Sequence, residues 1–202
     1  MARISVHRAP AAPTAHSQVA RRARILSSAA ELGAIHGYDG VQMQEVARGA
    51  GVAVGTVYRY FPSKTQLFLA VMAEEVFGGR ARTEADAGEA PSGDVADLLV
   101  GWTRRFMQRP KLALAMVQST LAAYSGRSAE AREMDVLVAP EILELLGIEE
   151  PGEEELSKVR LLTYAWWGVV ISRLSDHMTQ AQAEEHIRLG TALFVTPARK
   201  PA

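Results

Sequence analysis

Apolar residues recur at helical spacing along most of this chain, and no stretch of useful length alternates between apolar and polar residues as a strand would. The pattern predicts an all-α protein. Helices are expected over residues 17–36, 43–50, 54–60, 63–79, 95–108, 112–124, 128–146, 153–178 and 179–195. Residues 112–124 are almost continuously apolar or small, which predicts a helix that is buried on every side.

Two segments of low apolar content divide this pattern. Residues 1–16 are rich in Ala, Pro, Arg and His without periodicity, which predicts a disordered basic arm. Residues 80–94 read RARTEADAGEAPSGD, which is typical of a linker or loop. We therefore expect one domain over residues 17–79 and a second over residues 94–196.

Composition narrows the class of protein. With 202 residues, 48% of them apolar, the chain can bury a sizeable core. It has no cysteine, so disulfides and thiolate metal sites are excluded. No apolar run reaches the roughly 18 residues of a membrane span, and the N-terminus lacks the apolar stretch of a secretory signal. A cytoplasmic protein is expected.

Residues 42–61 carry the one pattern that predicts a defined partner. Two short helical segments flank Gly51, where the chain must turn sharply, and this arrangement predicts a helix-turn-helix. In such a motif the second helix lies in the major groove of DNA. On that helix Val57 is left for the core. The residues predicted to face DNA are Gly55, Thr56, Tyr58, Arg59 and Tyr60, followed by Lys64 in the first turn of the next helix.

Charge is distributed unevenly along the chain, although the net charge is only −1. Residues 1–64 contain eight Lys or Arg and three Asp or Glu, a net charge of +5. The remaining residues contain 14 basic and 20 acidic side chains, a net charge of −6. The positive charge therefore coincides with the predicted motif, which favours binding to phosphates and predicts strong salt dependence.

The string GYDGVQMQEVARGAGVAVGTVYRYFPSK, residues 37–64, resembles the TetR-type one-component repressors. RRARIL upstream and LFLAVM downstream extend the resemblance. Within the family, the sequence of this segment is most similar to actinobacterial regulators of steroid catabolism. The resemblance implies a homodimer whose N-terminal domain binds a palindromic operator and whose C-terminal domain binds a small molecule that releases the DNA. This chain departs from the family pattern at Val41 and Gln42, where many members have Ser or Thr, and at Val54, where many have Lys or Arg. Gln42 or Gln44 would then contact a phosphate or base, and Val54 would contact a thymine methyl.

The C-terminal half contains candidate residues for ligand binding and for self-association. Aromatic and methionine side chains that could line a pocket for a small apolar ligand are Trp102, Phe106, Met107, Met116, Tyr124, Met134, Trp166 and Trp167, with Tyr124 or Thr163 as a polar contact. Candidate dimer-interface residues are Ala165, Gly168, Ser172 and Ser175 on one helix and Ile187, Gly190 and Phe194 on the next. Ordinary core packing is the alternative for both sets.

Catalysis is not expected. The chain has no cysteine, no phosphate-binding glycine loop and no His–Glu pair at metal-binding spacing, so we expect neither a metal nor a cofactor. Two alternatives to a ligand-controlled repressor remain open. One is a DNA-binding repressor without small-molecule control, and the other is a small-molecule binding protein without a regulatory role. Release of DNA by a ligand would distinguish a ligand-controlled repressor from both alternatives.

Overall fold

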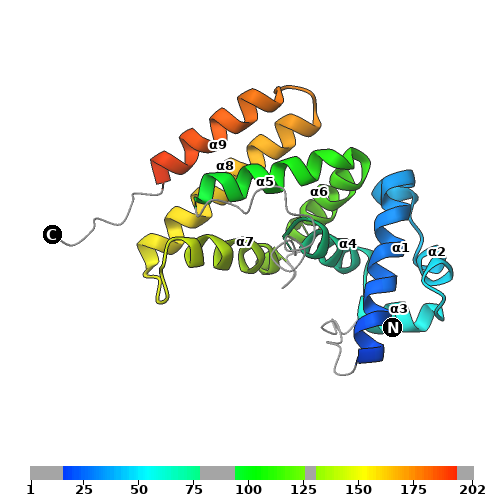
Figure 1. Cartoon of the computed structure of the whole chain (residues 1–202). Coiled ribbons are helices and arrows are strands. Elements are labelled where there is room, and N and C mark those ends of the chain that lie inside the picture. The colour runs from blue at the N-terminus through cyan, green and yellow to red at the C-terminus, as the bar shows by residue number, and fades with distance from the viewer. Residues whose placement is uncertain (1–15, 78–93, 126–130, 195–202) are drawn as a thin grey trace. The chain divides into compact units, whose positions relative to one another are not determined.

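A computed structural model of the chain describes residues 16–77, 94–125 and 131–194. Within these ranges every regular element is a helix, which confirms the predicted fold class. The helices are α1 (His16–Gly40), α2 (Met43–Gly49), α3 (Val54–Tyr60), α4 (Lys64–Met72) with a short π-helix η1 (Ala73–Phe77), α5 (Val95–Gln108), α6 (Pro110–Ser125), α7 (Ala131–Leu145), α8 (Glu153–Leu174) and α9 (Gln180–Phe194) (Figure 1). The predicted arm apart from His16 and the predicted linker apart from Asp94 lie outside these ranges.

Side chains just before the helices explain where several of them begin. The Ser63 hydroxyl accepts a hydrogen bond from the backbone N–H of Gln66 at 3.1 Å, at the start of α4. The Asp94 carboxylate accepts one from Ala96 at 3.0 Å, at the start of α5. Such caps satisfy N–H groups that have no partner within the helix. The predicted start of α4 at Ser63 is thereby accounted for.

The chain divides into two compact units. The first contains the helices up to Glu74 together with residues from Lys111 to the end of α6. The second contains residues from Glu75 to Pro110 together with α7, α8 and α9. Helix α6 therefore groups with the N-terminal helices, although the sequence pattern placed it in a C-terminal domain.

The first unit has a core built from all of its helices. Ile25 and Ala29 of α1, Val46 of α2, Val57 of α3, and Leu67 and Phe68 of α4 have no exposed surface. Helix α6 contributes Leu112 and Ala113, but its Leu114 and Leu121 are 49% and 59% exposed. The prediction that this helix is buried on every side is therefore wrong. A continuous apolar run has no periodic contrast from which a buried face can be identified.

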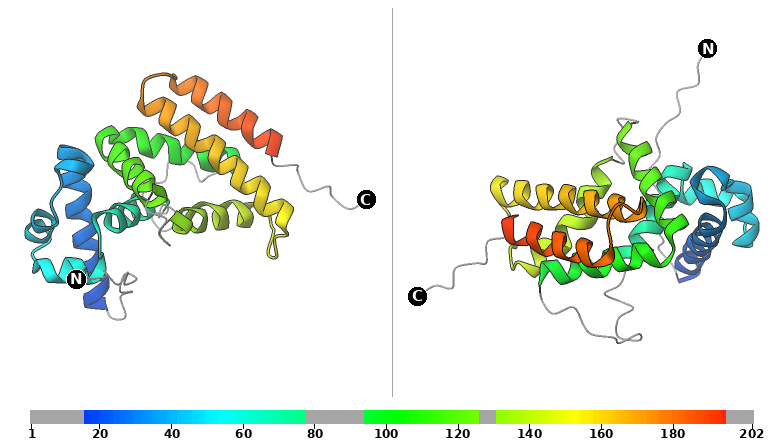
Figure 2. Two further views of the ribbon diagram at one scale, coloured as in Figure 1. Left: turned by 180° about the vertical axis from the view of Figure 1, so that it is seen from behind. Right: turned by 90° about the horizontal axis from the view of Figure 1, so that it is seen from above.

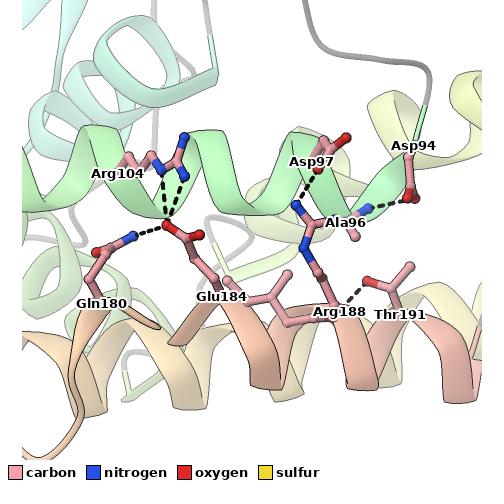
Figure 3. A network of polar contacts seen from close by, with 9 residues as sticks. Asp94, Ala96, Asp97, Arg104, Gln180, Glu184, Arg188 and Thr191 are labelled. Carbon is pink, nitrogen blue, oxygen red and sulfur yellow. Dashed lines mark hydrogen bonds and ion pairs between the residues drawn. The ribbon is translucent and has the colours of Figure 1, made fainter. Parts of the chain in front are cut away.

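In the second unit, α8 and α9 form a helical hairpin, and α5 lies alongside it in every view (Figures 1 and 2). Polar contacts fasten α5 to α9 at two points (Figure 3). Arg104 donates from Nε and Nη2 to Glu184 Oε1 at 3.0 and 2.9 Å, and Gln180 Nε2 donates to the same oxygen at 2.7 Å. One turn further on, Arg188 Nη2 donates to Asp97 Oδ1 at 2.7 Å.

These contacts make a small part of the stability depend on pH. The hydrogen bond from Gln180, followed by that from Arg104, lowers the pKa of Glu184 below its ordinary value. A lowered pKa stabilises the fold above the ordinary glutamate value of about 4.3, and this stabilisation is lost as the pH falls through the lowered pKa. Glu184→Gln should reduce the unfolding free energy by less than about 1 kcal/mol at pH 7. Urea titrations should show this difference shrinking below pH 4, with the exposed Glu185→Gln as an unaffected control.

Candidate nucleic-acid interface

The turn between α2 and α3 has the geometry that the sequence predicted at Gly51. This glycine has φ 64°, in the left-handed region that residues with a β-carbon rarely adopt. Its N–H donates to the Arg48 carbonyl at 3.2 Å, and the next N–H, of Val52, donates to the Ala47 carbonyl at 3.0 Å. This pair of bonds closes the end of α2 and turns the chain directly into α3.

Helix α1 fixes the position of α2 through its polar side chains. Ser28 Oγ donates to the Val46 carbonyl at 3.1 Å, and Arg24 Nε donates to the Ala50 carbonyl at 3.2 Å. Ser28 also lies against Gly49, where an added β-carbon would collide with its hydroxyl oxygen. The sequence analysis missed Ser28 and Gly49, because a serine and a glycine within helical segments give no signal of a contact between helices.

Helix α3 presents one exposed side. Val57 has no exposed surface, whereas Val54 is 38% and Tyr58 49% exposed. Gly55 and Arg59 are also exposed, and Thr56 is half-buried. On α2, the predicted contact residues Gln42 and Gln44 are exposed, with Gln42 just before the first turn. Seven of the predicted contact residues are therefore accessible to a DNA duplex.

Two arginines add positive charge to the motif. The Arg48 side chain, 80% exposed, lies 3.5 Å from Glu45 on the same helix, an arrangement that leaves it open to solvent. The Arg59 guanidinium lies 5.5 Å from the centre of the Tyr60 ring, which restricts the directions in which it can point. From the sequence, Arg48 was counted only in the net charge of residues 1–64. Its position in the last turn of the first motif helix could have predicted an exposed cation at the motif.

Tyr60 and Lys64 differ from the other predicted contact residues. Tyr60 is only 2% exposed because it follows Val57 by three positions and shares the inward side of α3. The structure therefore places its side chain in the core. Lys64 is half-buried, and its ammonium donates to the backbone carbonyls of Tyr38, Val41 and Asp39. Tyr60 is therefore buried, whereas Lys64 stays partly exposed and is bonded to the backbone.

Four of the predicted pocket residues form one aromatic cluster in the second unit. Trp166 lies 5.7 Å from Trp102, 6.0 Å from Phe106 and 5.2 Å from Trp167, measured between ring centres. Trp102, Phe106 and Trp166 are each at most 3% exposed. The Trp166 N–H donates to Thr103 Oγ1 at 2.9 Å and to the Leu99 carbonyl at 3.2 Å. These rings are in direct contact, at distances typical of aromatic pairs.

The other predicted pocket residues differ in how far the structure describes them. Met107 is half-buried on α5, and Met116 is buried within the first unit. The side chains of Tyr124 and Met134 lie outside the described residues. Thr163 is buried, and its hydroxyl donates to the Val159 carbonyl at 2.8 Å within α8.

The predicted dimer-interface residues lie along α8 and α9 with different exposures. Ala165, Gly168 and Ser175 are exposed, Ser172, Gly190 and Phe194 are half-buried, and Ile187 is 3% exposed. A recess of about 370 Å³ lies in this region, and Trp166, Ala165, Gly190 and Leu193 are among the residues that line it. Large apolar side chains are exposed on the same two helices: Leu161, Tyr164, Ile171, Leu189 and Leu193.

Gly55 offers a direct test of the exposed side of α3. A β-carbon built at Gly55 meets no atom within 4 Å, so Gly55→Ala should leave the free protein folded and raise its stability by up to about 1 kcal/mol. A duplex docked on this side would meet the new methyl group. We expect DNA affinity to fall about tenfold while the melting temperature stays the same or rises, as measured by anisotropy and thermal unfolding. Unchanged affinity would place the duplex elsewhere.

The described part of the chain was compared with two further kinds of site, a metal centre and a membrane-spanning helix. Among those residues, no three His, Asp or Glu side chains gather as metal ligands. None of the helices there is long and apolar enough to cross a bilayer.

Comparisons with known proteins agree with this geometry. The pattern described as "Bacterial regulatory proteins, tetR family" matches residues 25–71, and "Tetracyclin repressor-like, C-terminal domain" matches residues 88–194. "HTH-type transcriptional repressor KstR" of Rhodococcus jostii is 29% identical over 182 residues, which cover 90% of this chain and 86% of the relative. The KstR protein of Mycobacterium tuberculosis is 30% identical over 182 residues, covering 89% and 82%.

A solved structure extends the agreement to three dimensions. "Crystal structure of a TetR transcriptional regulator from Rhodococcus sp. RHA1" matches with a TM-score of 0.79 and 40% identity, covering 91% of this chain and 100% of that one. The helix-turn-helix, the C-terminal match and these relatives agree with one another. The chain therefore belongs to the TetR family of DNA-binding transcriptional regulators and is not an enzyme.

Proposed function

We propose that this protein is a cytoplasmic, dimeric repressor that leaves its operator when a large apolar molecule binds. The observation that carries the proposal is the accessible side of α2 and α3, of which α2 is bonded to α1 through Ser28 and Arg24. A rigid, exposed recognition helix is suited to reading base edges. Repression rests on the relatives, which are named repressors.

The dimer is supported by the exposed apolar surface of α8 and α9. Leu161 and Tyr164 of α8 are 50% and 52% exposed, and Leu189 and Leu193 of α9 are 58% and 71% exposed. Large apolar side chains that are exposed on two neighbouring helices are typical of a contact site for another protein. Small residues beside them, Ala165 and Gly168, would let a second copy approach closely. Two such hairpins related by a two-fold axis would make a four-helix interface.

The operator follows from this symmetry. A two-fold dimer would place its recognition helices about 34 to 36 Å apart, or a multiple of that, to enter successive major grooves. We therefore propose a palindromic site. DNA upstream of the protein's own gene is the first candidate, because regulators of this family often control themselves or a neighbour.

The ligand is proposed to bind against the aromatic cluster of α5 and α8. Trp102, Phe106 and Trp167 surround Trp166, whose only polar atom is already bonded to Thr103 and Leu99. Such a surface offers mainly apolar contact, which suits a large apolar molecule. The resemblance to regulators of steroid catabolism makes steroid-like molecules the first class to test.

Helix α6 provides a physical route from ligand to DNA. It follows α5 in the sequence, yet all of it after Pro110 belongs to the same compact unit as the DNA-binding helices. Lys111 Nζ donates to the Ile35 carbonyl of α1 at 3.4 Å, and Leu112 lies close to Gly33. A ligand that favours another position of α6 would weaken operator binding by its difference in affinity for the two states, typically about 1 to 3 kcal/mol.

The proposal can be tested with purified protein in two steps. The first is an anisotropy titration against the upstream DNA and a scrambled duplex at two salt concentrations. The second adds steroids and fatty acids to the preformed complex. Because all three tryptophans of the chain belong to the aromatic cluster, Trp emission reports binding there without a label. We expect selective, salt-sensitive binding, release by a steroid, and a change in Trp emission over the same concentration range.

Each alternative gives a different result. Selective DNA binding that no apolar molecule reverses would favour a repressor without small-molecule control. Changes in Trp emission without selective DNA binding would favour a small-molecule binding protein outside gene regulation. Release without any change in Trp emission would show that the ligand binds at a site other than the aromatic cluster.

A further inference from the structure

Lys64 is held by the segment that joins α1 to α2. It is the first residue of α4, directly after the turn through which the chain leaves α3, and it is half-buried. Its ammonium donates to the Tyr38 carbonyl at 2.8 Å and to the Val41 carbonyl at 3.3 Å. Tyr38 lies in the last turn of α1, and Val41 leads into α2. Two backbone carbonyls thus fix the ammonium from one side.

The ammonium keeps another side that a phosphate can reach. A lysine ammonium has three N–H donors. The two contacts with Tyr38 and Val41 are partly buried, whereas the third, with the Asp39 carbonyl, is 3.5 Å long and exposed to solvent. A contact of that length is weak, and a charged phosphate oxygen is a stronger acceptor than a carbonyl. The N–H on this side is therefore available to the sugar-phosphate strand, as the sequence predicted for Lys64.

The Tyr38 ring covers a further side of the same ammonium. Lys64 Nζ lies over the ring, 4.6 Å from its centre, where the negative face of an aromatic ring attracts a cation. Tyr38 thus contacts the ammonium twice, with its carbonyl and with its ring. Because lysine has a long and flexible stem, these two contacts restrict where its charge can lie before DNA arrives.

The ring itself is held by α4. The Tyr38 hydroxyl and Thr65 Oγ1 lie 3.0 Å apart, within hydrogen-bond distance. The ring also meets Phe68 edge to face, with 5.5 Å between ring centres, and Phe68 has no exposed surface. Both partners lie on the helix that begins with Lys64. The ring therefore keeps its place relative to the lysine.

We infer that Tyr38 is a positioning residue for DNA binding: its ring holds the Lys64 ammonium in the direction from which it binds a phosphate of the duplex. Tyr38 acts through Lys64. A charge that is already in place loses less side-chain freedom when the complex forms, and the affinity is correspondingly higher. The inference rests on DNA binding by this unit and is independent of any small molecule.

A double-mutant cycle tests whether Tyr38 acts through Lys64. The DNA is the duplex that the wild-type protein binds selectively, and anisotropy measures affinity where circular dichroism shows each variant folded. Tyr38→Leu should weaken binding about fivefold, and Tyr38→Phe, which keeps the ring, less than about twofold. Lys64→Met should weaken binding about tenfold and lower the slope of log affinity against log salt by about 0.9 for each half-site. In the Lys64→Met background, Tyr38→Leu should have no further effect.

A purely structural Tyr38 would give a different result. Its replacement would weaken binding by the same factor with and without the Lys64 side chain. That outcome, or a Lys64→Met variant with wild-type affinity, would overturn the inference. Tyr58→Leu is the matched control, because it makes the same chemical change on the exposed side of α3 and should have the same effect in both backgrounds. If the Tyr58 effect also disappears in the Lys64→Met background, the coupling is not particular to Tyr38 and the inference fails.

Magnetic resonance of the wild-type protein tests the same geometry without a substitution at Tyr38. The chain has four lysines, so isotope-labelled lysine gives four sets of side-chain signals, and Lys64→Met identifies one of them. Protons over an aromatic face resonate upfield. The ε-methylene signal of Lys64 should therefore lie upfield in the free protein and should shift when the duplex is added. An ordinary position, or no response to the duplex, would contradict the inference. Selective DNA binding is measured separately, so either result leaves the regulatory function standing.

Discussion

Replacing Leu189 and Leu193 together by glutamate should leave a folded monomer that binds operator DNA at least about 100-fold more weakly than the wild type. Both side chains are more than half exposed on α9, so the substitution removes little packing within the chain. In a dimer they would be covered, and charges placed there would lose water without gaining partners. The loss in DNA affinity follows because a monomer engages one half-site and loses the gain from linked binding.

Sedimentation velocity measures the assembly, and anisotropy measures the DNA affinity of the same samples. The matched control is Leu114→Glu with Leu121→Glu, two leucines that are 49% and 59% exposed on α6. This pair makes the same chemical change on a helix of the other compact unit, and it should leave the dimer intact. If the control dissociates as well, the effect comes from added negative charge. If the α9 variant stays dimeric, the interface lies on another surface.

Local signals in the sequence were sufficient to find the DNA-binding motif. Gly51 predicted a turn, and its φ of 64° is what that turn requires. Val57 was left for the core and has no exposed surface. A helix was expected to start at Ser63, and the Ser63 hydroxyl caps α4 by accepting a hydrogen bond from Gln66. Each of these predictions depends on residues only a few positions apart, where backbone geometry and side-chain chemistry act directly on one another.

Contacts between distant residues could not be predicted in this way. Lys64 was expected at the DNA surface, yet its partners are carbonyls 23 to 26 positions away, and a single sequence does not indicate which backbone groups a lysine will meet. Tyr60 carries the hydroxyl and aromatic ring that suit a contact with DNA. Its side chain nevertheless points inward, because Tyr60 follows the buried Val57 by three positions on α3. The predicted pocket was a list of aromatic and methionine residues, and tertiary structure alone determines which of them meet.

The grouping of α6 with the DNA-binding helices was likewise beyond reach from the sequence. Its cause is visible in the structure at Gly33 of α1, where the lack of a side chain lets two neighbours come close. A β-carbon built there would lie 2.7 Å from Phe68 Cε1 and 3.0 Å from Leu112 Cδ1. Phe68 has no exposed surface and Leu112 is 1% exposed, so neither can move aside into solvent.

Gly33→Ala should therefore destabilise the protein, although alanine is the better helix former. The gain in helix propensity is about 1 kcal/mol, whereas adding a methyl group to a filled core typically costs about 1 to 3 kcal/mol. We expect a net loss of about 1 kcal/mol, and about 2 kcal/mol or more for the larger Gly33→Val. Urea unfolding followed by circular dichroism measures both. Gly101→Ala in α5 is the matched control, because a β-carbon there meets nothing within 4 Å and should stabilise the helix.

A double-mutant cycle assigns the loss to the contact with α6. Leu112→Ala alone should cost about 2 to 5 kcal/mol through the cavity that it leaves. In the Leu112→Ala background, Gly33→Ala should cost less than in the wild type, because one of its two colliding neighbours is gone and the other can move into the space. Additive costs would show that α6 does not press on α1 at Gly33, and the proposed route from ligand to DNA would then need another contact.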